Sequence, residues 1–525
     1  MKIVATRQIR ELDRLAINRF NIPGRTLMER AGRGVAQAVM RLCGEHCLAR
    51  NVLLAAGKGN NGGDVFVAAR RLKERGFDVQ VLLAGERSQL RGDALCHFKK
   101  MLRRGVAIRE IKTEAEWRKF AAAGPHGELT GYPVAVDGIL GTGLEGKARG
   151  IAAGAIRFIN TLAEKSLVVA VDIPSGLNSD TGRAEGEVVR ADLTVTMGLP
   201  KRGLAEPAAL EYVGRLETLD IGFPPALTGK IKAEMELITA SDLAPLFRRR
   251  ARQAHKGSYG HLLIMGGAAG YSGAITLAAL AAVRSGAGLV TAVVPERLAP
   301  LVAVNVPEAM VYGAPETGCG SLDSACWTKW KKQLNGFSAV LAGPGMTRHA
   351  ATARLVKLIL RDSKIPAALD ADALNVFAGR AALLAKRKCP LVITPHPGEM
   401  ARLLGVNAAR VQANRLEIVR KAALATQAAV VLKGAGTLVA ARGETTQINL
   451  TGNPGMACGG MGDVLAGLLG GLLAQRMKPF DAARAAVFLH GRAGDAAAAK
   501  TTERALIARD LIACLPRAFR EIGGR

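Results

Sequence analysis

The glycine-rich segment Asn453–Asp463 is the stretch of the chain best suited to chemistry. Its glycines would leave backbone amides free at the N-terminus of the apolar helix expected from Val464, and free amides bind anions. Asp463 stands where a carboxylate could take a proton from a hydroxyl that attacks phosphorus. The alternative interpretation is that Asp463 is a simple N-cap of this helix.

Two further segments of the second half place polar groups at the ends of expected strands. His396 lies between two prolines, and a rigid polar side chain at a strand end suits a binding site. A structural or merely exposed histidine is the alternative. Lys433 opens a glycine-bounded turn and therefore offers both a charge and free amides to a phosphate.

The first half carries a glycine-rich turn, Gly57–Asp64, that fits the GxGxxG template of a dinucleotide fold. Asn60, Asn61 and Asp64 add amide and carboxylate oxygens, which suit a cation or hydroxyl groups better than an anion. A plain turn, in which Asn and Gly supply left-handed backbone, is the alternative.

Further polar positions follow expected strands of the first half. Asp172 and Ser175 share a strand end, where a carboxylate and a hydroxyl could act as acid–base group and ligand; a structural Asx turn is the alternative. Asp137 ends the strand before. The segment Gly141–Ala148 matches a P-loop except that Ala148 replaces the Ser or Thr that binds magnesium. Its amides and Lys147 could still hold phosphate.

These positions need a scaffold, and both halves alternate short apolar runs with helical Ala-, Leu- and Arg-rich stretches. The alternation predicts an α/β protein of two domains, each a parallel sheet with helices on both faces. We place the domains at residues 1–228 and 229–525, because Gly222–Pro225 and Pro245–Gly260 suit a connector. The expected strands are Asn51–Ala56, Val79–Ala84, Val134–Val136, Leu167–Val171, Leu193–Met197, His261–Met265, Leu289–Val294, Ala339–Ala342, Ala367–Leu369, Leu391–Thr394, Val430–Leu432 and Thr437–Ala440.

Residues 1–225 resemble the epimerase domain of NAD(P)H-hydrate repair enzymes. The motifs that carry the resemblance are Pro23–Gly24, Leu27–Gly32, Gly59–Asp64, Asp137 with Gly141–Leu144, and Asp172–Gly176. The resemblance implies a Rossmann-like three-layer sandwich that interconverts the R and S hydrates at nicotinamide C6. One departure is Val65, because the family usually has Gly after the Asp64 position.

The same resemblance implies roles for individual residues. Asp172 would be the acid–base group, and a potassium ion would be held by Asn61, Asp137 and Ser175, whose oxygens fit a hard cation. The implied substrate contacts are Asn60, Asn61, Gly62, Gly63, Asp64, Gly141, Thr142, Gly143, Leu144, Glu145, Gly146, Lys147 and Asp172.

Residues 235–523 resemble the ADP- or ATP-dependent NAD(P)H-hydrate dehydratases of the ribokinase-like superfamily. The motifs are GGAAGYSGA, GPG, DADALN, TPHPGEM, LKGAGT and NPGMACGGMGDVLAG, although Thr is more usual where Cys458 and Met461 stand. The resemblance implies a ribokinase-like α/β domain in which Asp463 is the catalytic base and magnesium accompanies ADP or ATP. The hydrated NADH or NADPH would contact Ala274, Gly345, His396 and Asp463, and the nucleotide would contact Lys433, Gly434, Ala435, Gly436, Thr437 and Gly462.

Bulk properties limit the other functions. The net charge of +28 fits phosphate-rich substrates, but only 4% of residues are aromatic and much of the excess lies on helical stretches, so nucleic acid is not expected as a partner. No stretch predicts a membrane span or a signal peptide, and the eight scattered cysteines suggest no zinc site, so we expect a cytoplasmic protein. We also expect a homo-oligomer.

Two alternative functions stay open at this point. The second half could be a kinase of another small alcohol, such as a hydroxymethylpyrimidine or thiazole kinase, although the TPHPGEM segment argues against it. The first half could be a catalytically silent binding module, because Val65 departs from the epimerase pattern.

Overall fold

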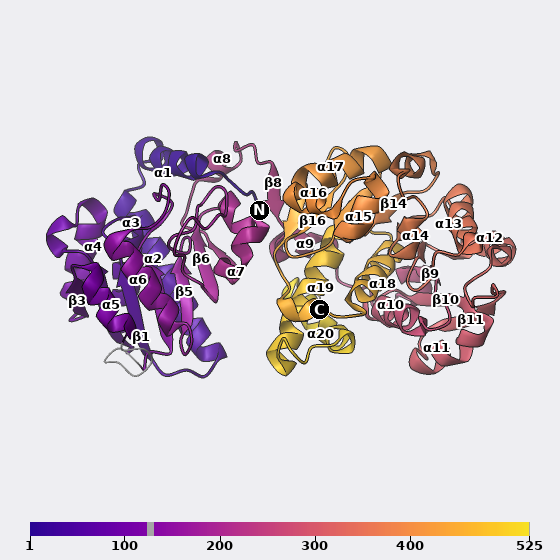
Figure 1. Cartoon of the computed structure of the whole chain (residues 1–525), viewed down its shortest axis with the longest axis horizontal. Helices are drawn as coiled ribbons and strands as arrows, with labels where there is room; N and C mark the ends of the chain where they lie inside the picture. The colour runs from indigo at the N-terminus through magenta and orange to yellow at the C-terminus, as the bar shows by residue number, and fades with distance from the viewer. Residues whose placement is uncertain (123–130, 524–525) are drawn as a thin grey trace. The chain divides into compact units, whose positions relative to one another are not determined.

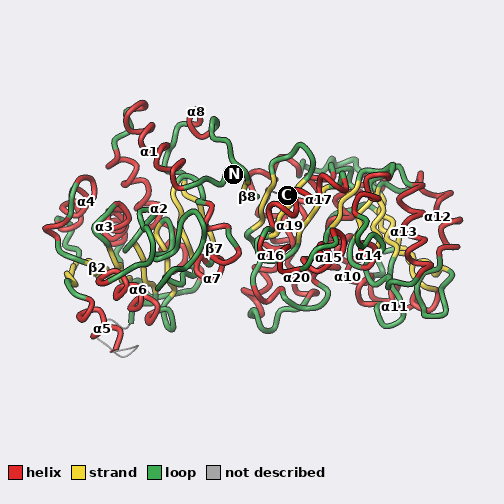
Figure 2. Tube along the Cα trace, turned by 45° about the horizontal axis from the view of Figure 1, so that its top comes forward, coloured by secondary structure: helices red, strands yellow, loops and turns green. Residues whose placement is uncertain are grey.

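The computed structural model describes residues 1–122 and 131–523, which divide into two compact units. The N-terminal unit comprises Lys2–Ala233, and the C-terminal unit comprises Glu234–Arg525 together with Met1. Figure 1 follows both units along the chain, and Figure 2 shows that the strands of each unit lie among helices. Within the described ranges, every helix is too short or too polar to span a bilayer.

The N-terminal unit is built on a seven-stranded sheet in the order β3-β2-β1-β4-β5-β6-β7, and every neighbouring pair is parallel. Its strands are β1 (Asn51–Ala56), β2 (Asp78–Ala84), β3 (Ala107–Ile111), β4 (Val134–Gly138), β5 (Leu167–Val171), β6 (Leu193–Met197) and β7 (Arg215–Leu219). Its helices are α1 (Thr6–Phe20), α2 (Gly24–Glu45), α3 (Asn60–Lys73), α4 (Gly92–Leu102), α5 (Glu114–Ala122), α6 (Gly150–Leu162), α7 (Leu210–Val213) and α8 (Pro225–Thr228).

The C-terminal unit has a ten-stranded sheet in the order β11-β10-β9-β12-β13-β14-β15-β16-β17-β8. Its strands are β8 (Met235–Leu237), β9 (His261–Met265), β10 (Leu289–Pro295), β11 (Met310–Ala314), β12 (Ala339–Ala342), β13 (Ala367–Leu369), β14 (Leu391–Ile393), β15 (Ala429–Leu432), β16 (Thr437–Ala440) and β17 (Thr446–Asn449). Its helices are α9 (Ala240–Leu243), α10 (Ser272–Arg284), α11 (Ala299–Asn305), α12 (Trp327–Gln333), α13 (Ala350–Asp362), α14 (Asp372–Asn375), α15 (Pro397–Leu404), α16 (Ala408–Ala413), α17 (Arg415–Thr426), α18 (Met461–Ala474), α19 (Pro479–Thr501) and α20 (Ala508–Glu521).

The predicted α/β class is confirmed, with one correction in the C-terminal unit. Strand β16 runs antiparallel to both β15 and β17. The connection from Leu432 to Thr437 is a short turn, whereas a parallel crossover needs a dozen or more residues. The expectation of a wholly parallel sheet was therefore wrong for this edge.

Helices α10 and α18 pack against each other and against the central strands of the C-terminal sheet. Helix α18 is buried along almost its whole length, and its glycines allow close approach to α10, since a Cβ at Gly467 would lie 2.0 Å from the carbonyl oxygen of Ala278. Burial of this kind fixes the helix, and with it the glycine-rich segment that precedes it.

Candidate functional site

The predicted site residues of the N-terminal unit gather at the carboxyl ends of β1, β4 and β5. The strand order reverses between β1 and β4, and ligands of open α/β sheets bind at such a switch point. Asn61 joins the three strand ends, because its side-chain amide donates to the carbonyl oxygens of Leu140 at 2.9 Å and Val171 at 2.7 Å.

The glycine-rich turn of this unit is the start of helix α3. Gly59 is the N-cap, and no residue of the described range 57–64 has a positive φ, so the plain left-handed turn is ruled out. Gly62 must lack a side chain because its Cβ would lie 1.9 Å from the carbonyl oxygen of Gly57. Asn60 is exposed, Asn61 is half-buried, and Gly62, Gly63 and Asp64 are buried.

Asp137 and Ser175, two of the predicted potassium ligands, are in direct contact. The hydroxyl of Ser175 donates to Oδ1 of Asp137 at 2.6 Å, and the amide of Ser175 donates to Oδ2 at 2.8 Å. Burial raises the pKa of Asp137 to about 6 against these hydrogen bonds. The donors that it meets within the described residues are neutral, so a cation beside these oxygens would stabilise the buried carboxylate.

Asp172 is held at the end of β5 by the last residues of β6 and by the loop that follows them. Its Oδ1 accepts from Thr196 Oγ1 at 3.2 Å, from the amide of Met197 at 3.0 Å, and from Nζ of Lys201, a side chain only 1% exposed. These partners lie far along the chain, so the Asx-turn interpretation is wrong. Asp172 also has a φ of +68°, an unusual backbone for a non-glycine residue that often marks functional sites.

Two more carboxylates lie near enough for their charges to interact with this ion pair. Burial raises the pKa of Asp64 well above its ordinary value, and the charges of Asp172 and Asp13 add to the effect. Burial likewise raises the pKa of Asp13, on α1, to about 6. We call Asp13, Asp64, Asp172 and Lys201 the Lys201 cluster.

The segment Gly141–Lys147 is only partly drawn into this site. A Cβ at Gly141 would lie 2.7 Å from Oδ1 of Asn61, and the carbonyl oxygen of Thr142 accepts from Arg10 at 2.8 Å. Leu144 is half-buried, whereas Gly143, Glu145, Gly146 and Lys147 are exposed.

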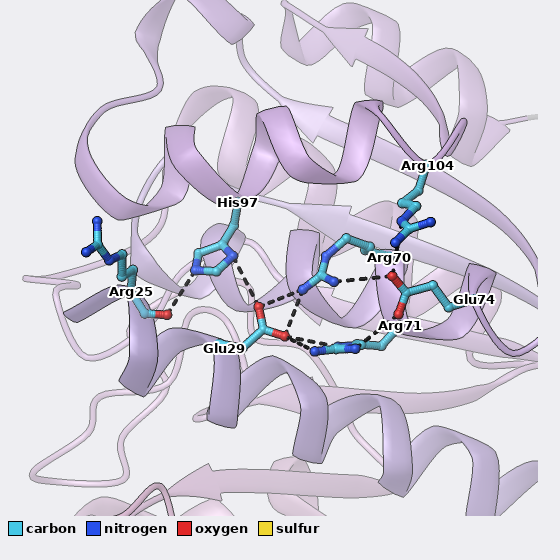
Figure 3. A network of polar contacts seen from close by, with 7 residues as sticks. All are labelled: Arg25, Glu29, Arg70, Arg71, Glu74, His97 and Arg104. Atoms are coloured by element: carbon cyan, nitrogen blue, oxygen red, sulfur yellow. Dashed lines mark hydrogen bonds and ion pairs between the residues drawn. The ribbon is translucent and has the colours of Figure 1, made fainter. Parts of the chain in front are cut away.

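A network of ion pairs around Glu29, a residue of the Leu27–Gly32 motif, links α3 to the neighbouring helices (Figure 3). Glu29 on α2 binds Arg70 of α3 at 2.6 Å and lies 3.6 Å from Nδ1 of the buried His97 on α4. Burial raises the pKa of Glu29, but the hydrogen bonds from Arg71 and Arg70 outweigh burial, so its pKa lies below the ordinary value. The network ties three helices together behind the glycine-rich turn.

In the C-terminal unit, the strand order reverses between β9 and β12, and two predicted contacts meet there. Gly345 follows β12 with a φ of +64°, and a Cβ on it would lie 3.2 Å from the Cβ of Ala274 on α10 and 2.8 Å from the carbonyl oxygen of Tyr271. Gly345 and Ala274 therefore border the same space.

Asp463 lies in the first turn of α18 and is not its N-cap. The cap is Gly460, whose φ of +87° is left-handed, so the N-cap interpretation of Asp463 is wrong. Burial, with the nearby charge of Asp370, raises the pKa of Asp463 to about 7. A carboxylate with such a pKa is suited to act as a base near neutral pH.

Lys433 joins this carboxylate to two others. Its Nζ lies 2.8 Å from Asp370 and 3.7 Å from Glu399, and a Cβ at Gly462 would lie 3.6 Å from it. Burial lowers the pKa of Lys433, but Asp370 and Glu399 outweigh burial and raise it overall. We call Asp370, Glu399, Lys433 and Asp463 the Lys433 cluster.

The turn after Lys433 is supported from beneath by Arg415 of α17. This side chain donates to the carbonyl oxygens of Leu432, Lys433 and Gly436, the last at 3.1 Å. Gly434 and Ala435 are exposed, Thr437 is half-buried, and Gly436 is buried. Gly434 and Ala435 are therefore accessible to solvent, whereas the carbonyl oxygens of Leu432, Lys433 and Gly436 face Arg415.

His396 has a structural role as well as an exposed ring. Its Nδ1 caps α15 by accepting from the amide of Gly398 at 3.0 Å, and Nε2 lies 3.4 Å from Glu399. Burial lowers the pKa of His396 against the opposing charge of Glu399. Since Nδ1 accepts from an amide, Nε2 is the nitrogen left to meet a ligand.

The sequence motifs missed several residues of both clusters. Asp13 and Lys201 lie outside every motif, and Asp370, Glu399 and Arg415 were not singled out although two of them belong to quoted motifs. The signal for Lys201 was its position shortly after the buried strand Leu193–Met197, where a lysine needs an anionic partner.

Two family models match the chain. A model described as NAD(P)H-hydrate dehydratase matches residues 262–517, and a model of the YjeF-related protein N-terminus matches residues 24–203.

The similar proteins have related names. The bifunctional NAD(P)H-hydrate repair enzyme Nnr of Moorella thermoacetica is 42% identical over 522 residues, covering 99% of this chain and 97% of that protein. The enzyme of the same name from Coxiella burnetii is 38% identical over 505 residues, covering 96% of each. The structure of the ADP/ATP-dependent NAD(P)H-hydrate dehydratase from Bacillus subtilis, co-crystallised with ATP and Mg²⁺, is 31% identical with a TM-score of 0.48, covering 55% of this chain and 98% of that one.

Proposed function

The chain belongs to the family of bifunctional NAD(P)H-hydrate repair enzymes, and we propose that it regenerates NADH and NADPH from their hydrates. The N-terminal unit epimerises the R and S hydrates, and the C-terminal unit dehydrates the S form at the expense of ADP or ATP. The observation that carries the proposal is Asp463, a carboxylate with a pKa of about 7 behind a glycine-rich helix start.

The dehydration begins with proton removal. Asp463 takes the proton of the C6 hydroxyl, and the oxygen attacks the terminal phosphate of the nucleotide. The amides of Gly459–Gly462 and the ammonium of Lys433 would stabilise the developing negative charge, and the support is that a Cβ at Gly462 would lie 3.6 Å from Nζ of Lys433. Loss of phosphate from C6, together with loss of a proton from C5, then restores the ring double bond. Magnesium, when bound with the nucleotide, would neutralise phosphate charge.

Substrate and nucleotide binding are assigned to the positions that the sequence predicts. Ala274, Gly345 and His396 would contact the hydrate beside Asp463, and the support is that Ala274 and Gly345 border one space. The turn Lys433–Thr437 and Gly462 would hold the nucleotide, and the support is the closeness of Gly462 to Lys433.

In the N-terminal unit, Asp172 is assigned as the acid–base group, and Asn60–Asp64 and Gly141–Lys147 as substrate contacts. Asn61, Asp137 and Ser175 would hold potassium, which would supply positive charge near the substrate; the support is the buried Asp137 carboxylate among neutral donors. A cytoplasmic location and a homo-oligomeric state stay predictions from the sequence.

The test is recovery of absorbance at the reduced-nicotinamide band. The full chain is given mixed R and S NADPH hydrate with magnesium, potassium and either ADP or ATP. We expect full recovery with the native chain, recovery of only the S fraction with Asp172→Ala, and none with Asp463→Ala, after correction for spontaneous epimerisation. No recovery with either nucleotide would contradict the proposal.

A further inference from the structure

The Lys201 cluster contains more titratable groups than a single acid–base residue needs. The charge of one ammonium, Lys201, acts on three carboxylates, Asp13, Asp64 and Asp172, but only Asp172 bonds to it, and Asp64 and Lys201 are at most 8% exposed. Three negative charges around one positive charge in a buried space are unfavourable, so protons must be retained on the carboxylates that the lysine does not reach.

The geometry separates the carboxylates. Lys201 donates to Oδ1 of Asp172 and is itself fixed by accepting groups, Thr196 Oγ1 at 3.0 Å and the carbonyl oxygen of Met197 at 3.1 Å. Asp64 comes from helix α3 and has no ion pair among the described residues. Its pKa is raised first by burial and then by the charges of Asp172 and Asp13, and lowered only by the charge of Lys201.

We propose that Asp64 and Asp172 are the two halves of an acid–base pair for epimerisation, and that Lys201 is the positioning residue that holds Asp172 as the ionised half. This inference rests on the proposed epimerase function. Pairs of titratable groups whose surroundings differ in this way mark the acid and the base of many active sites.

Epimerisation of the hydrate would use both members of such a pair. C6 carries a hydroxyl beside the ring nitrogen. As the C6–O bond breaks, the nitrogen lone pair forms a C6=N double bond, and the proton of Asp64 moves to the leaving oxygen and makes water. A water molecule then adds to C6 from the opposite face, its proton goes to Asp172, and the C=N electron pair returns to nitrogen. A proton transfer from Asp172 to Asp64 resets the pair.

Asp13 has a different position in this scheme. It is half-buried on α1, and its pKa of about 6 is set by burial, lowered by Lys201 and raised by Asp172. Asp13 therefore adds negative charge near Asp64 and keeps the proton there, without any bond to Lys201 or Asp172 among the described residues. We expect it to influence the rate less than Asp64 does.

The experiment measures interconversion of the pure R hydrate into the S hydrate by the full chain in heavy-oxygen water, without nucleotide. We expect the native chain to incorporate heavy oxygen at C6 once per epimerisation. Asp64→Asn, which keeps the shape but carries no carboxyl proton, should lower kcat by about 10²–10⁴-fold with little change in KM. Asp13→Asn should lower it less. The matched control is Asp78→Asn, an exposed residue at the opposite end of a strand in the same sheet.

Two further measurements keep the inference falsifiable if Asp64→Asn folds poorly. The native rate should be bell-shaped in pH because one carboxyl must be protonated and the other ionised, and a rate that does not fall at alkaline pH would overturn the inference. Lys201→Arg, which keeps the charge, should retain more kcat than Lys201→Met. Dehydration of pure S hydrate by the same samples reports whether the C-terminal unit is intact, and denaturant unfolding followed by a probe in the N-terminal unit reports whether that unit is folded.

The outcomes distinguish the inference from the function on which it rests. A native chain that does not interconvert the hydrates contradicts the proposed function itself. A native chain that interconverts them, while folded Asp64→Asn keeps its rate or the product lacks heavy oxygen, overturns the acid–base pair alone.

Discussion

The Lys201 cluster and the Lys433 cluster are each made of one lysine and three carboxylates at the carboxyl ends of parallel strands, yet the lysine serves a different residue in each. Lys201 binds Asp172, the residue assigned to the chemistry. Lys433 binds Asp370 and lies near Glu399, which are neighbours of the assigned base Asp463.

The two positions of the lysine correspond to two ways of adjusting a carboxylate for acid–base chemistry. Where the lysine contacts the reactive carboxylate, as in the N-terminal unit, the charged form is stabilised directly. Where it contacts the neighbours, the reactive carboxylate keeps a raised pKa, about 7 for Asp463. A raised pKa makes a stronger base, which suits removal of a proton from an alcohol.

The largest expected effect comes from removing the base of one cluster while keeping the other. Asp463→Asn keeps the side-chain shape but cannot accept a proton, so kcat for dehydration of the S hydrate should fall about 10²–10⁴-fold. Epimerisation in the N-terminal unit should be unchanged. The two rates are measured on one sample, and a parallel loss of both would contradict the separation of the clusters.

The central strands of both sheets could be predicted from the sequence, because they are buried apolar runs. Strands β3, β7, β8 and β11 were missed, since they lie at or near sheet edges and carry half-exposed, mixed residues. Strand β17 was missed for another reason: its TQIN sequence is polar although it is buried. Only the tertiary partners of these segments make them strands.

The site was predictable where glycine patterns mark it and unpredictable where long-range contacts make it. The turn before α3 and the segment before α18 could be located from glycines alone. Lys201 and Asp172 are 29 residues apart in the sequence, and no local sequence pattern predicts their contact. Asp13 is likewise brought in by helix α1, which the motif analysis did not use.

The next prediction compares the cost of losing each lysine. Lys201→Met leaves Asp172 without its cation in a site where the lysine is 1% exposed, so the free energy of unfolding of the N-terminal unit should fall by about 3–5 kcal/mol. Lys433 is 19% exposed, so Lys433→Met should cost less, about 2 kcal/mol, because solvent screens the remaining carboxylates. Denaturant unfolding of the full chain, followed by a probe in each unit, measures both. Equal losses in the free energy of unfolding for Lys201→Met and Lys433→Met would contradict the prediction that the more deeply buried lysine contributes more to stability.

A smaller effect is expected from pH. Asp463 must be ionised to act as a base, so kcat/KM for dehydration should fall about tenfold per pH unit below a pKa of about 7. The same group affects stability in the opposite direction. Its folded pKa is raised from 3.8, so the folded state binds the proton more tightly, and stability should decrease as pH rises from about 4 to about 7.

Asp463→Asn supplies the control for this pH dependence. In that variant, the part of the stability change between pH 4 and pH 7 that belongs to this carboxyl should disappear, which thermal unfolding across that range can measure. If the native dehydration rate stayed flat below neutrality, Asp463 would not be the base.

The smallest expected effect concerns Val65 and Cys458, two residues at which the units differ from the usual family sequence. Val65 is fully buried in α3, and a Cβ at Gly138 of β4 would lie 2.2 Å from its Cγ2. Val65 therefore fills the space that a side chain at position 138 would take, and it packs against the sheet. Cys458, the departure before α18, is exposed and constrains little. The silent-module alternative, which drew on Val65, loses its physical basis if Val65 only packs.

A double-mutant cycle tests this packing. Val65→Ala should cost about 2 kcal/mol through the lost methyl groups and the cavity, and Gly138→Ala about 1–3 kcal/mol through overpacking. The double variant should cost about 1 kcal/mol less than the sum, because each change makes room for the other. Unfolding measures the cycle, and epimerisation by Val65→Ala should stay within about twofold of native, since the side chain faces the core. A large gain in epimerase rate would instead mean that Val65 tightens the glycine-rich turn against its substrate.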